Sequence, residues 1–357
     1  MKAIILAGGS GTRLWPASTQ AFPKQFLDID GNGVLLSQTL ERCQRLGMGD
    51  ECYVITRGSY ADHVSTLMNA FNPKCANNVI AEPLARNTAP AILLAAKYLE
   101  SVAGADKTDV MLFLPSDHLI VENPTFLQAF KLGEDLAKAG NIVIFGIQPD
   151  KPETGYGYIK APATDLDTIN PLMGQAFPVK AFKEKPNREV AESYLSEGGY
   201  YWNAGVFALT IETLYAELRN HFSEIEPFLT LDYETLLSHF AELPSISFDF
   251  AVMEKTDRAV VIPLDVQWSD VGSWDSIYEM LSKDDVGNVI QGNVIADGTT
   301  GSLLVNKTDR PMAVSGFSQI IAVQTQDGFL LTNLGDSQKI GQIQNQLQPK
   351  LVTLSPV

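Results

Sequence analysis

The sequence predicts an α/β protein with a doubly wound, mostly parallel sheet, followed by a small all-β region. Short apolar runs alternate with helical segments through the first half of the chain, and this alternation is typical of a parallel sheet built from strand–helix–strand units. After about residue 285 helical periodicity gives way to short, evenly spaced strands. The 357 residues are long for one domain. We therefore predict a large domain at 1–285 and a small C-terminal β domain at 286–357.

The first half is predicted to contain five buried strands with helices between them. The strands are KAIILA (2–7), CYVITR (52–57), NVIAEP (78–83), VMLFLP (110–115) and NIVIFGI (141–147). The helices are 34–46, 59–71, 88–102 and 124–139. Ser59 and Asn87 are the expected N-caps of the second and third helices, and Pro124 is expected to open the fourth. Ligands of such sheets bind beyond the carboxyl ends of the strands.

The middle of the chain is more mixed, and the last part is all-β. Strands are expected around turns at 154–160 and 176–186, then a helix at 187–197, a strand at 203–210, helices to about 255 and a strand at 258–264. The C-terminal strands are expected at 288–296, 302–306, 311–317, 319–325 and 328–333, before a last helix at 336–348. The repeated NVI at 288 and 293 suggests coiled, stacked strands.

Composition limits the classes of partner. The net charge is −16, from 42 acidic and 26 basic residues, which argues against a nucleic-acid-binding face. The three cysteines have no C-x-x-C spacing, so we expect free thiols in a reducing compartment. No signal peptide is expected, and no run of 18 apolar residues predicts a membrane span. These features indicate a cytoplasmic protein that binds neither nucleic acid nor membrane.

The first strand runs into a glycine-rich loop, GGSGTRLWP (8–16), followed by Pro23-Lys24. A dinucleotide fingerprint would need glycine at Leu14, and a Walker loop would need glycine at Arg13. The backbone N–H groups of such a turn suit phosphate oxygens, which Arg13 can grip at two points and Lys24 can meet with a compact charge. The loop glycines are Gly8, Gly9 and Gly11. They could merely form a tight turn, but the nearby cations favour a polyphosphate site.

Two carboxylates follow predicted strands. Asp117 lies in PSDH (115–118) and Asp270 in WSDVG (268–272). Two carboxylates with few other protein ligands suit Mg²⁺, which keeps waters and substrate phosphates in its coordination shell. Singly, each aspartate would be interpreted as a turn or cap residue, and His118 as a hydrogen-bonded structural residue.

Two further stretches carry polar groups suited to a nucleotide and a sugar phosphate. EPLARNTAP (82–90) opens a helix, where free N–H groups attract anions, and Glu82 could accept a hydrogen bond from a base amino group. FKEKP (182–186) follows a strand, and Asn203 lies among aromatic residues in YWNAGVF (201–207). Amides and carboxylates beside a lysine suit a phosphorylated sugar.

Taken together, these motifs resemble those of the sugar-1-phosphate nucleotidylyltransferases. GGSGTRLWP with PKQFL, then FKEKP, WNAGVF and WSDVG, occur in the order of that family. EPLARNTAP and PSDH resemble the branch that uses GTP and mannose 1-phosphate, and the likeness continues into GNVIADG and RPMAVSGFSQIIAVQT. It covers nearly the whole chain. An additional isomerase domain of some members is not expected within 357 residues.

The resemblance implies a nucleotide-diphospho-sugar transferase fold with a small left-handed β-helix-like domain, and a reaction that gives GDP-mannose and pyrophosphate. The implied catalytic residues are Arg13, Lys24, Asp117 and Asp270, the last two holding Mg²⁺. The implied nucleotide-binding residues are Leu6, Gly8, Gly9, Gly11, Thr12, Glu82, Arg86, Asn87 and Thr88. The implied sugar-phosphate-binding residues are Gly157, Glu184, Lys185 and Asn203.

Alternatives remain at this level. The same chemistry on another base or sugar, such as UTP or dTTP with glucose 1-phosphate, would need a similar loop. A non-catalytic sugar-nucleotide-binding regulator would be favoured by loss of Arg13, Lys24, Asp117 or Asp270, all of which are present. The residues alone do not select guanine or fix the oligomeric state, although the apolar strands of the β region are compatible with a homodimer.

Overall fold

The structure is a computed structural model that describes residues 1–9, 11–123, 125–162, 175–341 and 343. The chain divides into two compact units. The first consists of Met1–Gly8, Thr39–Ser116 and Val121–Val266, and the second of Gly9–Gln38, Asp117–Ile120 and Gln267–Val357. This division differs from the domain boundary predicted between residues 285 and 286. The second unit also includes the glycine loop and the segment around Asp117.

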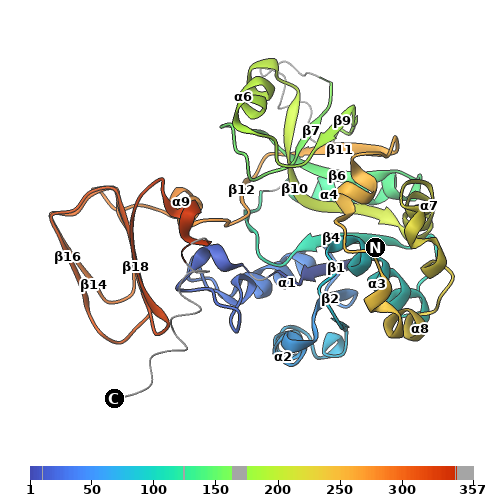
Figure 1. The fold of residues 1–357 in the computed structure, drawn as a ribbon, viewed down its shortest axis with the longest axis horizontal. Coiled ribbons are helices and arrows are strands. Elements are labelled where there is room, and N and C mark those ends of the chain that lie inside the picture. Colours follow the sequence, from blue (N-terminus) through green and yellow to red (C-terminus); the bar gives the residue numbers. More distant parts are fainter. Residues whose placement is uncertain (10, 124, 163–174, 342, 344–357) are drawn as a thin grey trace. The chain divides into compact units, whose positions relative to one another are not determined.

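A ten-stranded sheet forms the centre of the first unit (Figure 1). Its main path runs β3-β2-β1-β4-β10-β6-β11-β8, with β7 paired to β10 and β9 paired to β7. The strands are β1 (Lys2–Ala7), β2 (Cys52–Arg57), β3 (Val79–Glu82), β4 (Val110–Pro115), β6 (Ile142–Ile147), β7 (Tyr158–Lys160), β8 (Phe177–Pro178), β9 (Ala181–Lys183), β10 (Tyr200–Thr210) and β11 (Ala259–Leu264).

The predicted α/β class is confirmed, with one refinement. Strands β1 to β4 pair in parallel, as do β6 and β11. The long strand β10 inserts between β4 and β6 and runs antiparallel to both. Parallel pairing brings the carboxyl ends of β1 and β4 together, and the Ser116 N–H donates to the Leu6 carbonyl at 3.2 Å. The segments after these two strands therefore start from one edge of the sheet.

Helices cover both faces of this sheet. Helix α3 is almost wholly buried and shares one apolar core with α7, α8 and the sheet. On the other face α4 packs on β6 and β10, with Phe130 stacked on Phe145 at 4.3 Å. The helices are α1 (Leu35–Arg45), α2 (Ala61–Phe71), α3 (Thr88–Ser101), α4 (Phe126–Lys138), α6 (Arg188–Glu197), α7 (Ile211–His221) and α8 (Tyr233–Ser238). A π-helical turn, η8, spans Asp249–Met253.

Of the three predicted helix starts, one is confirmed, one is wrong and one lies outside the described residues. Asn87 caps α3 by accepting from the Thr88 N–H at 2.9 Å, as predicted. Ser59 does not cap α2, because a 3₁₀ turn, Gly58–Tyr60, intervenes and Tyr60 takes the N-cap position without a side-chain bond. Pro124 lies outside the described residues, and the N–H groups of Thr125 and Phe126 donate to the Asn123 side chain instead.

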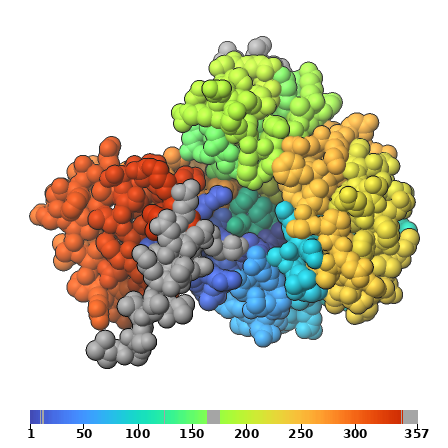
Figure 2. Space-filling view, in the orientation of Figure 1, coloured from blue at the N-terminus to red at the C-terminus, as the bar shows by residue number. Residues whose placement is uncertain are grey.

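A smaller lobe of the first unit contains β7, β9 and α6 (Figure 2, green to yellow-green). Helix α6 packs on this hairpin through Tyr194, whose ring lies 5.4 Å from that of Tyr158 and stacks on Tyr200 at 4.0 Å. Asn187 caps this predicted helix by accepting from the Val190 N–H, and Gly198, with φ of +73°, ends it. The FKEKP segment leaves β9 within this lobe.

The second unit is built around stacked strands. Strands β13, β15 and β17 pair in parallel, β14 pairs in parallel with β16, and β18 adds an antiparallel edge to β17. The elements are β5 (Leu119–Val121), β12 (Gln267–Ser269), α9 (Trp274–Met280), β13 (Val289–Gln291), β14 (Val294–Asp297), β15 (Leu303–Asn306), β16 (Met312–Ser315), β17 (Ile320–Thr325) and β18 (Gly328–Asn333). Parallel stacking of strands 14 to 18 residues apart fits the predicted coiled arrangement.

The two ends of the second unit's C-terminal part differ from the prediction. Helix α9 was not expected from the sequence. The last helix, expected at 336–348, is seen as a 3₁₀ turn, Ser337–Lys339, that continues into helix, and residues 342 and 344–348 lie outside the described residues. Within the described part of the chain, no helix has the length and apolar character needed to cross a membrane.

Candidate active site

Lys24 joins the two aspartates that the sequence singled out. Its Nζ atom lies 2.7 Å from Asp117 Oδ2 and donates a hydrogen bond to the backbone carbonyl of Asp270. The lysine side chain is 8% exposed and that of Asp117 is 27% exposed. Burial favours the neutral form of the Asp117 carboxyl, but the positive charge of Lys24 and the hydrogen bond that it donates hold the pKa of this carboxyl below the ordinary value. Asp117 is therefore ionised at neutral pH, as a phosphate- or metal-handling carboxylate must be.

The turn around Asp270 is locally strained and fixes its carboxylate. Val271 has φ of +50°, a left-handed conformation that a β-branched residue rarely adopts. Asp270 Oδ1 accepts from the Gly272 N–H at 3.0 Å, and a Cβ at Gly272 would lie 2.9 Å from Oδ2. Only glycine fits there without moving the carboxylate. Such strain is found where a side chain must be held in one place.

The glycine loop packs tightly against Lys24. Gly11 has φ of +56°, and a Cβ there would collide with the Cβ of Lys24. The Ser18 hydroxyl donates to the Gly11 carbonyl and closes the turn. Thr12 and Arg13 follow in a 3₁₀ turn, Thr12–Leu14. Arg13 is exposed and forms no ion pair with any described residue, which leaves its guanidinium available to an anion.

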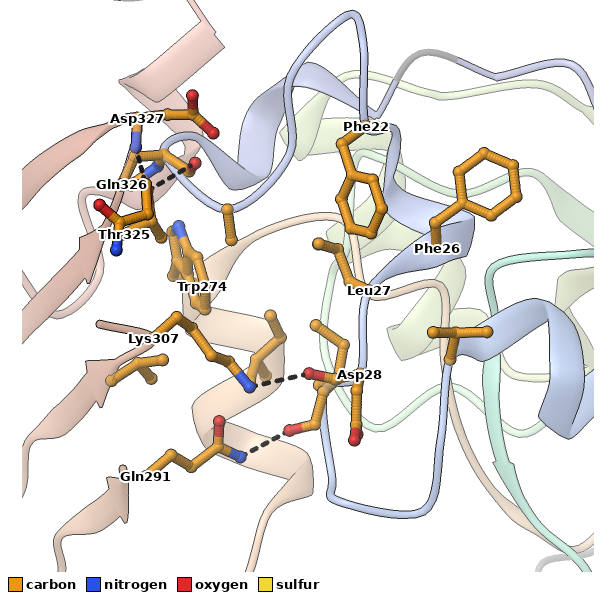
Figure 3. A pocket seen from close by; sticks show the side chains of 16 residues that line it. Phe22, Phe26, Leu27, Asp28, Trp274, Gln291, Lys307, Thr325, Gln326 and Asp327 are labelled. Atoms are coloured by element: carbon orange, nitrogen blue, oxygen red, sulfur yellow. Dashed lines mark hydrogen bonds between the residues drawn. The ribbon is translucent and has the colours of Figure 1, made fainter. Parts of the chain in front are cut away.

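The segment that carries Lys24 is braced by the C-terminal strands of the same unit. It forms one wall of an apolar pocket of about 380 Å³, with Phe22, Phe26 and Leu27 on one side (Figure 3). Lys307 donates to the Asp28 carbonyl at 3.2 Å, and Gln291 to the Ile29 carbonyl at 2.6 Å. The β region thus positions the Lys24 segment, although it contributes no predicted catalytic residue.

In the first unit, Gly8 and Glu82 come together. A Cβ at Gly8 would lie 3.0 Å from Glu82 Oε2, so a larger residue would crowd the carboxyl. Burial raises the pKa of Glu82 to about 7, against the opposing effect of the Arg57 charge. Leu6 lies in β1, two residues before Gly8, and is partly buried.

The other predicted nucleotide-binding residues have structural contacts of their own. Arg86 donates to the Ala241 carbonyl, and the Thr88 hydroxyl accepts from the Phe248 N–H at 2.8 Å. Asn87 caps α3 from a left-handed conformation with φ of +67°. These bonds hold the loop after β3 in place. A nucleotide-binding role for the three residues stays a prediction.

The four predicted sugar-phosphate residues meet in the first unit. A Cβ at Gly157 would lie 2.7 Å from Glu184 Oε2 and 3.4 Å from the Asn203 Cβ, and the Asn203 N–H donates to the Gly157 carbonyl at 2.8 Å. Asn203 stands where β10 breaks its register with β6. Lys185 has φ of +44° and pairs with Glu184. Residues of the motifs FKEKP and WNAGVF therefore lie next to each other around Gly157.

Sequence reasoning missed an acidic neighbour of this group, Asp249. Burial, followed by the charge of Glu184, raises the pKa of Asp249 to about 6. Asp249 begins the π-helical turn η8, and Glu254 just after that turn accepts from the Glu184 N–H at 3.2 Å. Isolated π-turns are frequent at functional sites. The sequence FDFAVM contains no local sign of such a turn.

The aspartates fit a divalent metal only together with a substrate. Among the described residues no group of three or more His, Cys, Asp or Glu side chains could hold a metal ion. His118 is engaged elsewhere, because its Nδ1 accepts from Trp268 Nε1 at 3.3 Å. Mg²⁺ commonly takes one or two carboxylates and completes its shell with water and phosphate oxygens. Asp117 and Asp270 would supply those two carboxylates.

Parallel strands that end at a phosphate-suited glycine loop, with a lysine held against two aspartates, define an α/β enzyme that handles nucleotide phosphates. Comparison with known proteins makes the class specific. Residues 2–286 match the family model described as Nucleotidyl transferase. The chain belongs to the nucleotidyl transferase family.

Two curated relatives and one solved structure are similar to most of this chain. A mannose-1-phosphate guanylyltransferase from Klebsiella pneumoniae is 37% identical, over 94% of this chain and 72% of the relative. The alginate biosynthesis protein AlgA of Pseudomonas syringae pv. tomato is 38% identical, over 96% and 71%. A crystal structure from Thermus thermophilus, described as a mannose-1-phosphate geranyltransferase, has 30% identity and a TM-score of 0.81, and the match covers 97% of this chain and 99% of that one.

Proposed function

We propose that this chain transfers GMP from GTP to mannose 1-phosphate and releases pyrophosphate. One observation carries the proposal: Lys24 is held between the Asp117 carboxylate and the Asp270 carbonyl, beside the tightly packed turn at Gly11. The names of the relatives supply the substrates.

In this proposal a phosphate oxygen of mannose 1-phosphate attacks the α-phosphorus of GTP in line. A new P–O bond forms as the bond from the α-phosphorus to the bridging oxygen breaks, and pyrophosphate leaves with that electron pair. Lys24 stabilises the negative charge at the reacting phosphates, and Arg13 meets the departing pyrophosphate. Positioning and electrostatics dominate such transfers, and no covalent enzyme intermediate is needed.

Asp117 and Asp270 would hold Mg²⁺ in this proposal. When bound, the ion supplies positive charge that neutralises phosphate oxygens and orients them. The chain's own contribution is to keep the Asp117 carboxylate ionised beside Lys24 and to fix the Asp270 carboxylate through the Gly272 N–H.

The two groups in the first unit are proposed to recognise the ends of the substrates. Glu82, Arg86, Asn87 and Thr88 would face the nucleoside, and Gly8 lets the base approach the backbone. Glu184 would accept hydrogen bonds from sugar hydroxyls near Gly157, and Asn203 would donate hydrogen bonds to them. Lys185 would bind the sugar phosphate. The support is the close contact among Gly157, Glu184 and Asn203.

A substrate panel tests the proposal. GTP, ATP, UTP and dTTP are each paired with mannose 1-phosphate and glucose 1-phosphate in the presence of Mg²⁺, and pyrophosphate release is followed. GTP with mannose 1-phosphate should have the highest kcat/KM. Faster turnover of UTP or dTTP with glucose 1-phosphate would retain the reaction class and overturn the assigned substrates.

We also propose that two copies associate through the edge strand β18. Phe329 and Leu331 alternate along its outward face and are each 53% exposed, and β18 has a strand neighbour, β17, on one side. An apolar edge strand of this kind favours pairing with another strand. Light scattering should give a dimer mass that falls to the monomer mass in Phe329→Asp/Leu331→Asp, whereas a monomeric wild type would contradict the proposal.

A further inference from the structure

Three residues from adjacent strands lie in register at one edge of the first unit's sheet. In the parallel pair β2–β3, Arg57 stands opposite Glu82, and in β1–β2, Ala7 stands opposite Thr56. Gly8 therefore follows at the level of Arg57. Residues opposite one another in a parallel pair direct their side chains to the same face of the sheet. Gly8, Arg57 and Glu82 thus form one corner at the carboxyl ends of β1, β2 and β3.

The Glu82 side chain of this corner is buried, the Arg57 side chain is half-buried, and the two form no ion pair with each other. Glu82 is 6% exposed, and no hydrogen bond or ion pair joins its carboxyl to any of the described residues. Arg57 Nε is shielded from solvent and also has no hydrogen-bond partner. The two groups influence each other through their charges but form no ion pair within 4 Å. Buried polar groups in native proteins are nearly always satisfied, so the Glu82 carboxyl and the Arg57 Nε atom call for a ligand.

The corner offers an acceptor and a donor, and these match one base best. Guanine carries adjacent donors at N1–H and the 2-amino group, and acceptors at O6 and N7. A carboxylate accepts from the two donors, and an arginine donates to O6 and N7, which is its commonest specific contact with a base. Uracil and thymine have a single N–H between two carbonyl oxygens, and adenine has no acceptor at position 6. Neither arrangement satisfies both protein groups at two points each.

We infer that Arg57 is a specificity-determining residue that, together with Glu82, selects guanine by contacting its O6/N7 edge beside Gly8. This inference rests on the proposed function and adds a residue that the sequence motifs did not indicate. A site of this kind selects guanine because other bases leave its polar groups without partners. A base that leaves the Glu82 carboxyl and the Arg57 guanidinium unpaired loses roughly 10- to 100-fold in binding relative to guanine.

Arg57→Met tests the inference, since it keeps the length of the stem and removes the donors. The variant and wild type are assayed with GTP, 7-deaza-GTP, ITP and ATP at saturating mannose 1-phosphate, and GTP binding is measured by calorimetry. Arg57→Met should lose roughly 10- to 100-fold in kcat/KM for GTP, mostly through KM. The GTP/ATP and GTP/7-deaza-GTP ratios should fall sharply, while the GTP/ITP ratio, which reports the 2-amino contact of Glu82, should stay.

Two control variants accompany this test, and its possible failures are distinguishable. Arg188→Met removes an exposed arginine of the same unit and should change no ratio. Arg57→Lys keeps a cation and is the second variant in case Arg57→Met is destabilised and melts at a lower temperature. Arg57→Lys should bind GTP more tightly than Arg57→Met does. A wild type that prefers GTP, with unchanged GTP/ATP and GTP/7-deaza-GTP ratios in folded Arg57 variants, overturns this inference alone. A wild type that prefers another nucleotide overturns the proposed function itself.

Discussion

Lys24 Nζ and Asp117 Oδ2 lie 2.7 Å apart, and the same ammonium donates to the Asp270 carbonyl. One buried cation therefore connects the segment after the glycine loop, the segment after β4 and the WSDVG turn. In Lys24→Met we expect kcat to fall by about 10²- to 10³-fold, the usual effect of removing one preorganised charge. The matched control is Lys74→Met, which breaks an exposed pair with Asp50. Near-normal kcat in folded Lys24→Met would show that the lysine is only a structural link.

Gly11 tests how closely the loop must pack. In Gly11→Ala the new Cβ would collide with Lys24 in a backbone conformation with φ of +56°. The control, Gly31→Ala, has φ of +82° but open space around the position. Both should lose about 1 kcal/mol of stability from the left-handed conformation. Only Gly11→Ala should also lose most of the turnover. Equal activity of the two variants in the pyrophosphate assay would contradict the tight-loop account.

Glu82 predicts a pH dependence of stability. Burial raises the pKa of this carboxyl from about 4.5 in the unfolded chain to about 7. Between these values the folded state binds more protons than the unfolded state, so the Glu82 contribution to stability falls as pH rises. Glu82→Gln cannot titrate. Its free energy of unfolding relative to wild type should therefore rise by up to about 3 kcal/mol from pH 4.5 to 7.5.

Urea unfolding at several pH values measures this difference. Glu189→Gln, at an exposed position of α6, serves as the control and should show no such trend. A wild-type and Glu82→Gln difference that is flat with pH would mean that the Glu82 carboxyl is not shielded in solution.

The strands were predictable from the sequence because each is a short, buried, β-branched run. VMLFLP and CYVITR have such runs and became β4 and β2 with the expected bounds. The position of β10 was not predictable, because the insertion of an antiparallel strand between β4 and β6 depends on pairing between distant segments. Helix α9 has a local sign in the sequence, because Ser273 and Ser276 form a reciprocal capping box.

The candidate site was predictable to a similar extent. The motifs identified Lys24, Asp117 and Asp270, and the structure brings these three together. Arg57 and Asp249 were not predictable in this way, since neither belongs to a glycine-rich or charged motif. Arg57 is indicated by its register with Glu82 at a strand end, and Asp249 by the effect of the Glu184 charge on its pKa. Both require knowledge of which distant segments are neighbours.

The C-terminal strands should be needed for activity without supplying a catalytic group. They contribute about half of the apolar core of the second unit, including Val305, Ile321 and Val323. Deleting residues 286–357 should therefore abolish turnover and reduce solubility. Gln291→Ala/Lys307→Ala removes only the two bonds to the Asp28–Ile29 backbone and should lower stability by about 1–3 kcal/mol, with a parallel loss of kcat. A soluble, fully active deletion variant would refute this role.

The most direct test of the guanylyl-transfer account is analysis of products formed from α-labelled GTP and mannose 1-phosphate with Mg²⁺. Wild type should give labelled GDP-mannose and unlabelled pyrophosphate in equal amounts. Asp270→Asn, which keeps the backbone carbonyl that Lys24 contacts, should form neither product at a comparable rate while melting near the wild-type temperature. Labelled GDP with inorganic phosphate, or equal product formation by Asp270→Asn and wild type, would contradict the account.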